Sequence, residues 1–217
     1  MTNRDVWEKS WQREDPEALF RYLIGSRDLE YAEIGFFKQA GIRSVCDAGC
    51  GFGTYTLALA TRGFSVEGFD VSETAVRLTR ENLRRLGYDV PMKVADILCT
   101  GYRDGQFDGV FAHSVLDHMT SEDARAAMEE LFRIVRPGGL VLLSFDTPEE
   151  ADRSAVHEVL PDGSLLCRDG MIVHPYDKDG ILKLVDGRKI VFEAVNRKGE
   201  QIVILEKQPR DPPPGRP

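Results

Sequence analysis

Strand-like and helix-like segments alternate between residues 44 and 145, and this order constrains the fold more than any other feature of the chain. The last strand-like run, LVLLSF, is apolar almost throughout, which suits a central strand covered on both faces. Strands that alternate with helices predict an α/β fold with an open, doubly wound, mostly parallel sheet. The strand-like segments are SVCDA (44–48), FSVEGFD (64–70), PMKVADIL (91–98), FDGVFAHS (107–114) and LVLLSF (140–145).

The two ends of the chain differ from this alternating region. Apolar spacing predicts one or two helices between about residues 16 and 40, so that residues 1–40 form a helical cap segment. Near the other end, RKIVFEAVN (188–196) and EQIVILEKQ (200–208) are joined by a short link, which predicts an antiparallel hairpin and a mixed sheet. We expect a single domain over residues 1–207, followed by a disordered proline-rich tail at 208–217.

Composition limits the classes of function. The 217 residues suffice for one sizeable domain, and the formal net charge of −8 argues against nucleic acid as the main partner, because phosphate binding needs clustered lysine and arginine. No apolar run approaches the ~20 residues of a membrane span, and the N-terminus has no apolar signal region, so we expect a cytoplasmic protein. The cysteines lack zinc-site spacing and are expected to be reduced thiols. They are Cys46, Cys50, Cys99 and Cys167.

The segment VCDAGCGFGTYTLALATRG ends a strand with Asp47 and has glycines in alternate positions, at 49, 51 and 53, before a helix. Glycines in such a turn let the backbone approach a ligand closely. A dinucleotide loop has the pattern G-x-G-x-x-G, and Thr54 stands where its third glycine should be, which opposes a nicotinamide-dependent oxidoreductase. A phosphate loop needs a lysine, which the segment lacks, and Asp47 suits a ligand with an ammonium group better than a phosphate.

Five motifs follow one another in order: VCDAGCGFGTYTLALA, VEGFDVSETAV, VADIL, FDGVFAHSVLDHM and LFRIVRPGGLVLLSF. In these motifs the sequence resembles the class I S-adenosylmethionine-dependent methyltransferases of the small-molecule type (methyltransferase type 11/12-like), over about residues 45–145. The resemblance implies a Rossmann-like sheet of seven strands with an antiparallel strand near one edge, and S-adenosyl-L-methionine as the cofactor. It also implies in-line transfer of a methyl group to a small-molecule acceptor. A protein that binds the cofactor without catalysis is a second alternative, besides the oxidoreductase.

The predicted nucleoside-binding residues follow strand ends. Asp70 lies nineteen residues past Gly51 at the end of its strand, where a carboxylate can accept hydrogen bonds from both ribose hydroxyls. Val71 offers an apolar wall to the adenine. The resemblance implies that Asp96 accepts a hydrogen bond from the adenine amino group and that Ile97 packs on the ring.

The methionine end of the cofactor has its own predicted partners. The resemblance implies that Asp47 contacts this end and that backbone carbonyls near Ala112 and His113 accept hydrogen bonds from its ammonium group. The glycines of the loop leave space for it. The predicted cofactor-binding residues are Asp47, Gly49, Cys50, Gly51, Asp70, Val71, Asp96, Ile97, Ala112 and His113.

Two histidines are the catalytic candidates. His118 lies in a cluster with His113 and Asp117 and is the first choice for a base or a substrate contact, while His174 precedes a proline where related enzymes often close over the pocket. A base is needed only if the acceptor carries a proton that it cannot lose on its own. The cluster has no fixed metal-ligand spacing, so no metal is predicted.

The acceptor is expected to be a small molecule and not nucleic acid. The fourth motif reads His-Ser-Val-Leu (113–116), where many amino-group nucleic-acid methylases have Asn-Pro-Pro-Tyr, so the acceptor atom stays open. The aromatic residues Trp7, Trp11, Tyr22 and Tyr31 could line the acceptor pocket from the cap, with core packing as the alternative, and Tyr22 and Tyr31 are the two to test. No membrane partner is expected, and the chain is expected to be a monomer or a homodimer.

Overall fold

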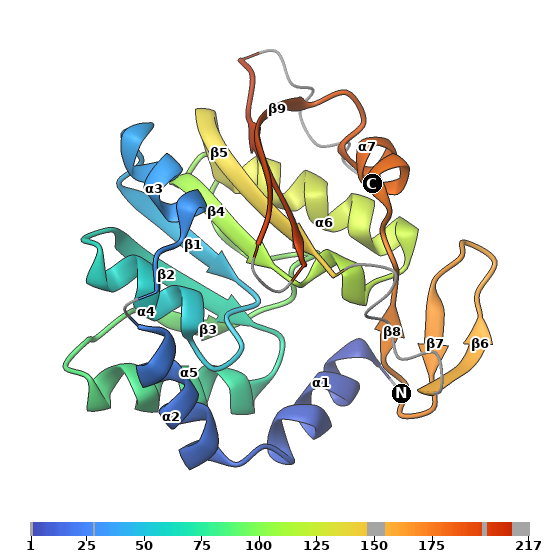
Figure 1. The fold of residues 1–217 in the computed structure, drawn as a ribbon, viewed down its shortest axis with the longest axis horizontal. Coiled ribbons are helices and arrows are strands. Elements are labelled where there is room, and N and C mark those ends of the chain that lie inside the picture. Colours follow the sequence, from blue (N-terminus) through green and yellow to red (C-terminus); the bar gives the residue numbers. More distant parts are fainter. Residues whose placement is uncertain (1, 28, 147–154, 197–198, 210–217) are drawn as a thin grey trace.

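The computed structural model describes residues 2–27, 29–146, 155–196 and 199–209 and has an α/β architecture (Figure 1). The strands are β1 (Ser44–Ala48), β2 (Ser65–Asp70), β3 (Met92–Val94), β4 (Phe107–His113), β5 (Val135–Phe145), β6 (Val156–Val159), β7 (Leu165–Cys167), β8 (Ile172–Val173), β9 (Lys189–Val195) and β10 (Gln201–Glu206). The helices are α1 (Asn3–Gln12), α2 (Pro16–Ser26), α3 (Ala32–Gln39), α4 (Thr54–Thr61), α5 (Glu73–Arg85), α6 (Ser121–Ile134) and α7 (Lys178–Val185), with a 3₁₀ helix η1 (Leu116–His118).

Seven strands form one sheet in the order β3-β2-β1-β4-β5-β10-β9. The first five are parallel, and β10 is antiparallel to both β5 and β9. The predicted Rossmann-like sheet, its antiparallel strand near one edge and the predicted hairpin are thereby confirmed. Because β2 and β4 both flank β1, the strand order reverses at β1, which opens a crevice beyond the carboxyl end of that strand.

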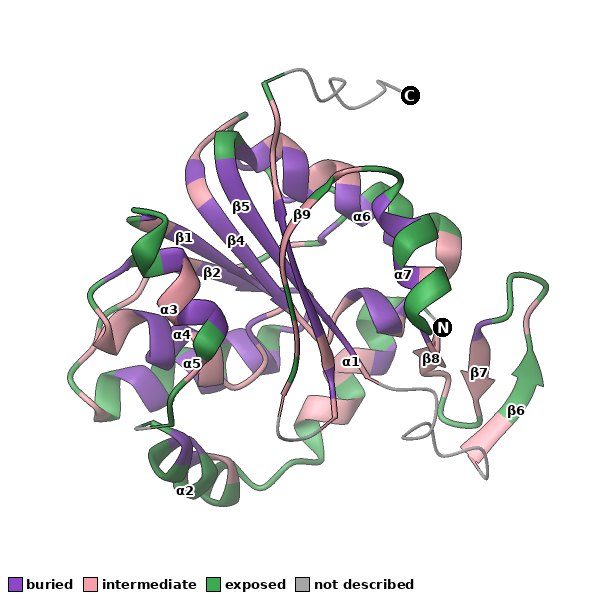
Figure 2. Ribbon diagram, turned by 45° about the horizontal axis from the view of Figure 1, so that its top comes forward, coloured by how far each residue is buried: buried purple, intermediate pink, exposed green. Residues whose placement is uncertain are grey.

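Helices cover both faces of the sheet, and its central strands are buried (Figure 2). In β4, Val110 and Ala112 belong to the apolar cluster that includes α6 and α7, whereas Phe111 belongs to the cluster that includes α3 and α4. Successive residues of the strand therefore pack into different layers, which explains why an unbroken apolar run forms a strand here.

Of the helical cap, α1 and α2 lie at the end where the parallel strands finish, whereas α3 packs on a face of the sheet (Figure 1). The first helix of the cap, α1, precedes the region in which the sequence predicts helices, and a capping box between Thr2 and Asp5 begins it. The Glu8 carboxylate then ties α1 to the start of α5, because it accepts hydrogen bonds from the hydroxyls of Ser72 and Thr74, both at 2.6 Å. The cap is thus fixed over the crevice.

The boundary between α6 and β5 differs from the prediction. The helix ends at Ile134, and the strand already begins at Val135, five residues before the predicted strand at 140–145 and ahead of the Pro-Gly-Gly sequence. Val135 is fully buried and pairs with Phe107. At Gly139 a Cβ atom would lie 2.4 Å from the carbonyl oxygen of Asp108, so this glycine permits the close approach of β5 to β4 rather than ending a helix.

The third strand is shorter than predicted. It ends at Val94, and Asp96 lies beyond it in a turn where its Oδ1 accepts a hydrogen bond from the Leu98 amide at 2.9 Å. Aspartate favours such turns because its side chain competes with strand hydrogen bonding. Asp96 still follows the carboxyl end of β3, which keeps it at the crevice.

A separate antiparallel sheet contains β6, β7 and β8 and stands beside the main sheet (Figure 1). A turn at residues 168–170 joins β7 to β8.

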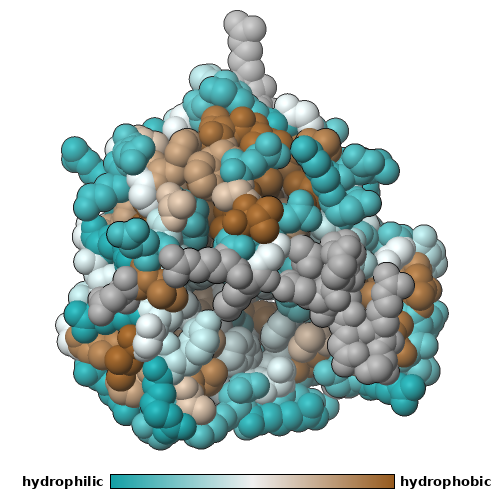
Figure 3. Space-filling model, viewed as in Figure 1, coloured by the Kyte–Doolittle hydropathy of each residue, from teal (hydrophilic) through white to brown (hydrophobic). Residues whose placement is uncertain are grey.

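On the face of the molecule that Figure 3 shows, hydrophobic side chains gather around α3 and β9. There the rings of Phe36 and Phe192 lie 5.2 Å apart, and Val195 is 69% exposed.

Some predictions fall outside this description. The tail at 208–217 lies almost entirely beyond the described residues, and the single-domain boundary stays a prediction. The four cysteines are free. Among the described helices, none is long and apolar enough to cross a bilayer.

Candidate functional site

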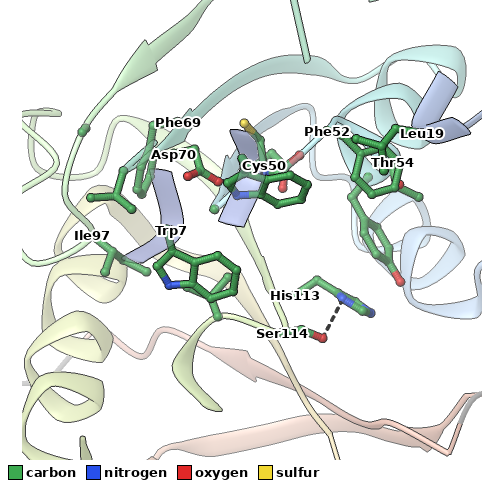
Figure 4. A pocket seen from close by; sticks show the side chains of 18 of the residues that line it. Trp7, Leu19, Cys50, Phe52, Thr54, Phe69, Asp70, Ile97, His113 and Ser114 are labelled. Atoms are coloured by element: carbon green, nitrogen blue, oxygen red, sulfur yellow. Dashed lines mark hydrogen bonds between the residues drawn. The ribbon is translucent and has the colours of Figure 1, made fainter. Parts of the chain in front are cut away.

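A cavity of about 680 Å³ lies where β1, β2 and β4 end. Figure 4 shows Asp70 and Ile97 on one side of it, Leu19 and Phe52 on the opposite side, and His113 between them at the lower edge. Helices α1 and α2 add further aromatic walls. Doubly wound sheets bind their ligands in this crevice.

The glycine loop forms the floor of the cavity, and both of its glycines that line the cavity occupy positions where a side chain would be strained. Gly49 has φ +73°, and a Cβ there would lie 2.7 Å from a methyl group of Val115. Gly51 has φ +54°, and a Cβ there would lie 3.1 Å from the ring of Trp11. Positive φ and close neighbours both exclude larger residues, which leaves bare backbone facing the cavity.

Asp70 joins this loop to the end of β2. Its Oδ2 accepts a hydrogen bond from the Gly51 amide at 3.0 Å, and its Oδ1 accepts one from the Ser72 amide at 2.9 Å. The residue is only 6% exposed, and this burial raises the pKa of its carboxyl. Each oxygen retains acceptor capacity beyond these bonds, which a ligand with hydroxyl groups could use.

Asp47 is buried deeper, at 2% exposure. The Thr56 hydroxyl donates to its Oδ2 at 2.5 Å. Burial nevertheless raises the pKa of the Asp47 carboxyl to about 6, because removal from water disfavours the charged form. Thr56, on the first turns of α4, has no role in the sequence analysis, since a threonine inside a helix carries no motif signal.

Nearly all of the predicted cofactor-binding residues line the cavity. The exception is Ala112, which is fully buried in β4. The specific contacts given to each residue remain predictions. The lining members of the set are Asp47, Gly49, Cys50, Gly51, Asp70, Val71, Asp96, Ile97 and His113.

The two catalytic candidates do not belong to the described lining. His118 is part of η1, where its ring meets the edge of Trp7 at a centroid distance of 5.0 Å and its Nδ1 lies 3.3 Å from the Ile172 carbonyl oxygen. His174 is half-buried and stacks on Tyr176 at 4.2 Å, and this burial lowers its pKa. Their catalytic roles stay predictions.

The prediction that no metal is used also stays a prediction. Potential ligand atoms of Asp117, His118 and Asp146 lie within 4.8 Å of one another, and His113 is not part of this group. One Asp117 oxygen already accepts a hydrogen bond from the Asp146 amide at 3.0 Å.

The structure shows which aromatic residues of the cap and of α4 line the cavity. Trp7, Trp11 and Tyr22 line the cavity from the cap, whereas Tyr31 packs on Tyr55 instead, with ring centroids 5.3 Å apart. Tyr55 itself lines the cavity, and sequence reasoning missed it because it lies inside a helical pattern.

Glu200 was also missed. It lines the cavity, and its Oε2 lies 3.2 Å from Nε2 of His113. No sequence signal connects these residues, because their proximity depends on the pairing of β10 with β5 and of β5 with β4.

The comparisons with known proteins agree on one type of domain. Residues 45–139 match a family model described as "Methyltransferase domain". Over 150 residues the chain is 31% identical to 2-heptyl-1-hydroxyquinolin-4(1H)-one methyltransferase of Mycobacteroides abscessus, and this match covers 66% of the chain and 65% of that protein. Over 157 residues it is 29% identical to tRNA (carboxymethyluridine(34)-5-O)-methyltransferase of Arabidopsis thaliana, which covers 71% of the chain and only 37% of that protein.

A solved structure supports the same fold. The crystal structure of a SAM-dependent methyltransferase from Methanosarcina mazei superposes with a TM-score of 0.69 at 24% identity, and it covers 82% of this chain and 98% of the other. The chain thus spans less than two thirds of the length of both curated relatives, while the fold matches over most of its residues.

Proposed function

Because the chain belongs to the class I S-adenosylmethionine-dependent methyltransferases, we propose that it transfers a methyl group from S-adenosylmethionine to a small-molecule acceptor. The observation that carries this proposal is one cavity with two kinds of lining residue. Asp70 and Ile97, which follow strand ends, line it together with the aromatic side chains of Trp7 and Trp11 of α1 and Tyr22 of α2. One space can therefore hold a nucleoside and an apolar acceptor together.

The residues present fit the cofactor. Bare backbone at Gly49 and Gly51 can approach a ligand that a Cβ at either position would crowd. Asp70 is held in place by two amides and can accept ribose hydroxyls, and Ile97 offers an apolar surface to a base. When bound, S-adenosylmethionine supplies an electrophilic methyl group on a sulfonium sulfur.

The protein's part in such a transfer is to align the acceptor and to exclude water. Trp7 and Trp11 of α1 line the cavity, and hydrogen bonds to the Glu8 carboxylate hold this helix to α5. Alignment alone can contribute up to ~7–11 kcal/mol to catalysis in favourable systems. A rigid aromatic lining that positions a planar acceptor serves this purpose.

A small acceptor is favoured over tRNA by the charge of the site. The relatives include enzymes named for a quinolinone and for a tRNA. Nucleic acid needs lysine or arginine beside the catalytic pocket, and among the described residues that line the cavity there is neither. The net charge of −8 points in the same direction. A cytoplasmic location and a monomeric or homodimeric state remain predictions.

Calorimetric titration tests the cofactor. We expect S-adenosylhomocysteine to bind the purified chain with a stoichiometry of about one, and NAD⁺ and NADH to give no measurable heat. Tritiated S-adenosylmethionine with pools of small metabolites and with bulk tRNA then tests transfer. Binding of the nicotinamide dinucleotides alone, or transfer to tRNA alone, would contradict the proposal.

A further inference from the structure

His113 is held on three sides at the edge of the cavity. Its ring packs on the ring of Tyr55, with centroids 4.3 Å apart and an interplanar angle of 30°. Its Nδ1 lies 3.2 Å from the Ser114 hydroxyl, and its Nε2 lies 3.2 Å from the Glu200 carboxylate, an ion-pair distance. Figure 4 shows the His113 and Ser114 side chains together at the cavity edge. The imidazole therefore has a fixed position, with its two nitrogens facing different partners.

The groups that hold the imidazole are themselves fixed. The Tyr55 hydroxyl donates to the buried carboxylate of Glu33 at 3.3 Å. The Glu200 carboxylate accepts a hydrogen bond from the side-chain amide of Asn196, and the Glu200 backbone amide donates to Asn196 Oδ1 at 3.1 Å. Such a supporting shell is what a reactive side chain needs to keep one orientation.

The carboxylate also decides which nitrogen of His113 can take a proton. A neutral imidazole carries its proton on one nitrogen, and a carboxylate beside Nε2 favours the proton there. Nδ1 then carries the lone pair, which accepts a hydrogen bond from the Ser114 hydroxyl at 3.2 Å until an acceptor hydroxyl takes the place of that donor. Ser114 is a non-glycine residue with φ +49°, a strained conformation that concentrates at functional sites.

The lining of the cavity limits the charge of the acceptor. Four carboxylates line it, and among its described lining residues there is no lysine or arginine. An acceptor with a carboxylate or phosphate would meet these carboxylates, with no lysine or arginine of the described lining to offset them. The same cavity is lined by the rings of Trp7, Trp11, Tyr22 and Phe52, which suit a planar apolar body. The carboxylates are Asp47, Asp70, Asp96 and Glu200.

We propose that His113 is the base of the transfer, that Glu200 is its positioning residue, and that the acceptor is an uncharged, planar molecule methylated on a hydroxyl oxygen. This inference rests on the proposed function. An oxygen lone pair forms the new bond to the methyl carbon as the carbon–sulfur bond breaks, and the bonding pair returns to sulfur, which becomes a neutral thioether. The hydroxyl proton goes to Nδ1 of His113. The positive charge thus passes from sulfur to the imidazolium, where the Glu200 carboxylate stabilises it.

A chromogenic phenol tests the proton transfer without turnover. The protein is loaded with S-adenosylhomocysteine and titrated with 4-nitrophenol at a pH below the pKa of the free phenol. We expect binding with the absorption of the phenolate in the wild type, and binding with the absorption of the neutral phenol in His113→Gln. The matched control His157→Gln, on exposed β6, should behave as the wild type. A neutral spectrum in the wild type, a phenolate spectrum in His113→Gln, or no binding of 4-nitrophenol would overturn the inference.

Transfer assays and an anionic probe test the acceptor class. With tritiated S-adenosylmethionine and 1-naphthol, we expect kcat to fall on the order of 10²-fold in His113→Gln and about 10-fold in Glu200→Gln, with KM nearly unchanged. In the wild type, kcat should fall towards low pH, and this fall should be absent in His113→Gln. Binding of 4-nitrobenzoate as tight as that of 4-nitrophenol, or transfer to 1-naphthylamine but not to 1-naphthol, would contradict an uncharged hydroxyl acceptor.

Calorimetry separates the two levels of failure. We expect His113→Gln and Glu200→Gln to bind S-adenosylhomocysteine as the wild type does. Such binding would also show that both variants fold. If the wild type binds it and only the phenol experiments fail, this inference alone is wrong. If the wild type does not bind it, the proposed function fails first.

Discussion

Oδ2 of Asp70 accepts a hydrogen bond from the backbone amide of Gly51 at 3.0 Å, across nineteen residues of sequence. The bond joins the end of β2 to the glycine loop after β1, the two segments that the sequence assigns to the ribose and to the methionine end. One carboxylate therefore both shapes the loop and faces the cavity.

Replacing this carboxylate should weaken cofactor binding. We expect Asp70→Ala to reduce the affinity for S-adenosylhomocysteine by on the order of 1.5–3 kcal/mol, the range for lost hydrogen bonds to a charged group, while the fold stays intact. Calorimetry with circular dichroism measures both effects. The matched control is Asp89→Ala, an exposed aspartate after α5. Unchanged affinity in Asp70→Ala would remove this residue from the site.

Asp47 should couple pH to stability. Because burial raises its pKa to about 6 in the folded protein, its protonated form is favoured by folding, and this contribution is fully present below the unfolded pKa and lost as the pH rises through the folded value. Asp47→Asn does not titrate. We therefore expect the variant to gain on the order of 2–3 kcal/mol in unfolding free energy relative to the wild type between about pH 4 and about pH 7.

The same variant should bind the cofactor less well above about pH 6, since the ammonium group of the methionine end loses its carboxylate. Denaturant titrations and calorimetry at several pH values measure the two effects. An Asp47→Asn variant that gains or loses both stability and cofactor affinity would count against the role given to Asp47. So would differences from the wild type that do not depend on pH.

Glu8 should control access to the cavity. Burial opposes its charge, but hydrogen bonds from Ser72 and Thr74 prevail and lower the pKa of its carboxyl to about 2, so it is ionised throughout the physiological range. In Glu8→Gln the cap loses its charged tie to α5, and we expect S-adenosylhomocysteine to dissociate about tenfold faster. Stopped-flow fluorescence of Trp7 and Trp11 follows this step. Glu14→Gln, exposed beyond the end of α1, is the control, and equal rates in both variants would exclude a role of Glu8 as the tie.

Gly49 should tolerate no side chain. Gly49→Ala combines a positive φ, which costs about 1–2 kcal/mol, with a contact of 2.7 Å to Val115. Gly63→Ala has φ +86° and no neighbour within 4 Å, so it measures the backbone cost alone. We expect Gly49→Ala to be the more destabilising of the two in thermal unfolding and to bind S-adenosylhomocysteine more weakly. The double variant with Val115→Ala should recover part of the loss, and no recovery would show that the contact with Val115 is unimportant.

The sequence predicts the fold, and it predicts most of the strand-end residues that meet at the cavity, because both depend on local order; the contacts of these residues with the cofactor stay predictions. The alternation of segments requires a parallel sheet, and the spacing of Asp70 from the glycine loop follows from one strand, one helix and the next strand. The strand boundaries at Val94 and Val135 were less predictable, since hydrogen bonding of Asp96 and the close approach at Gly139 depend on neighbouring segments.

Apart from aromatic residues of the cap such as Tyr22, the proposed acceptor side could not be predicted, because it depends on contacts between distant segments. The positive φ of Ser114 turns the chain after β4 into η1, which carries His118 against Trp7 while His113 stays at the cavity edge. Glu200 reaches His113 only through the order of strands β4, β5 and β10. Neither relationship leaves a pattern in the sequence.

A crystal structure of the chain grown with S-adenosylhomocysteine tests the central claim most directly. We expect the ribose hydroxyls within hydrogen-bond distance of the Asp70 carboxylate, the adenine against Ile97 and the sulfur in the same space as the aromatic rings of the cap. A nucleoside bound away from the ends of β1 and β2, or a sulfur separated from the aromatic side of the cavity by closed protein, would contradict the account.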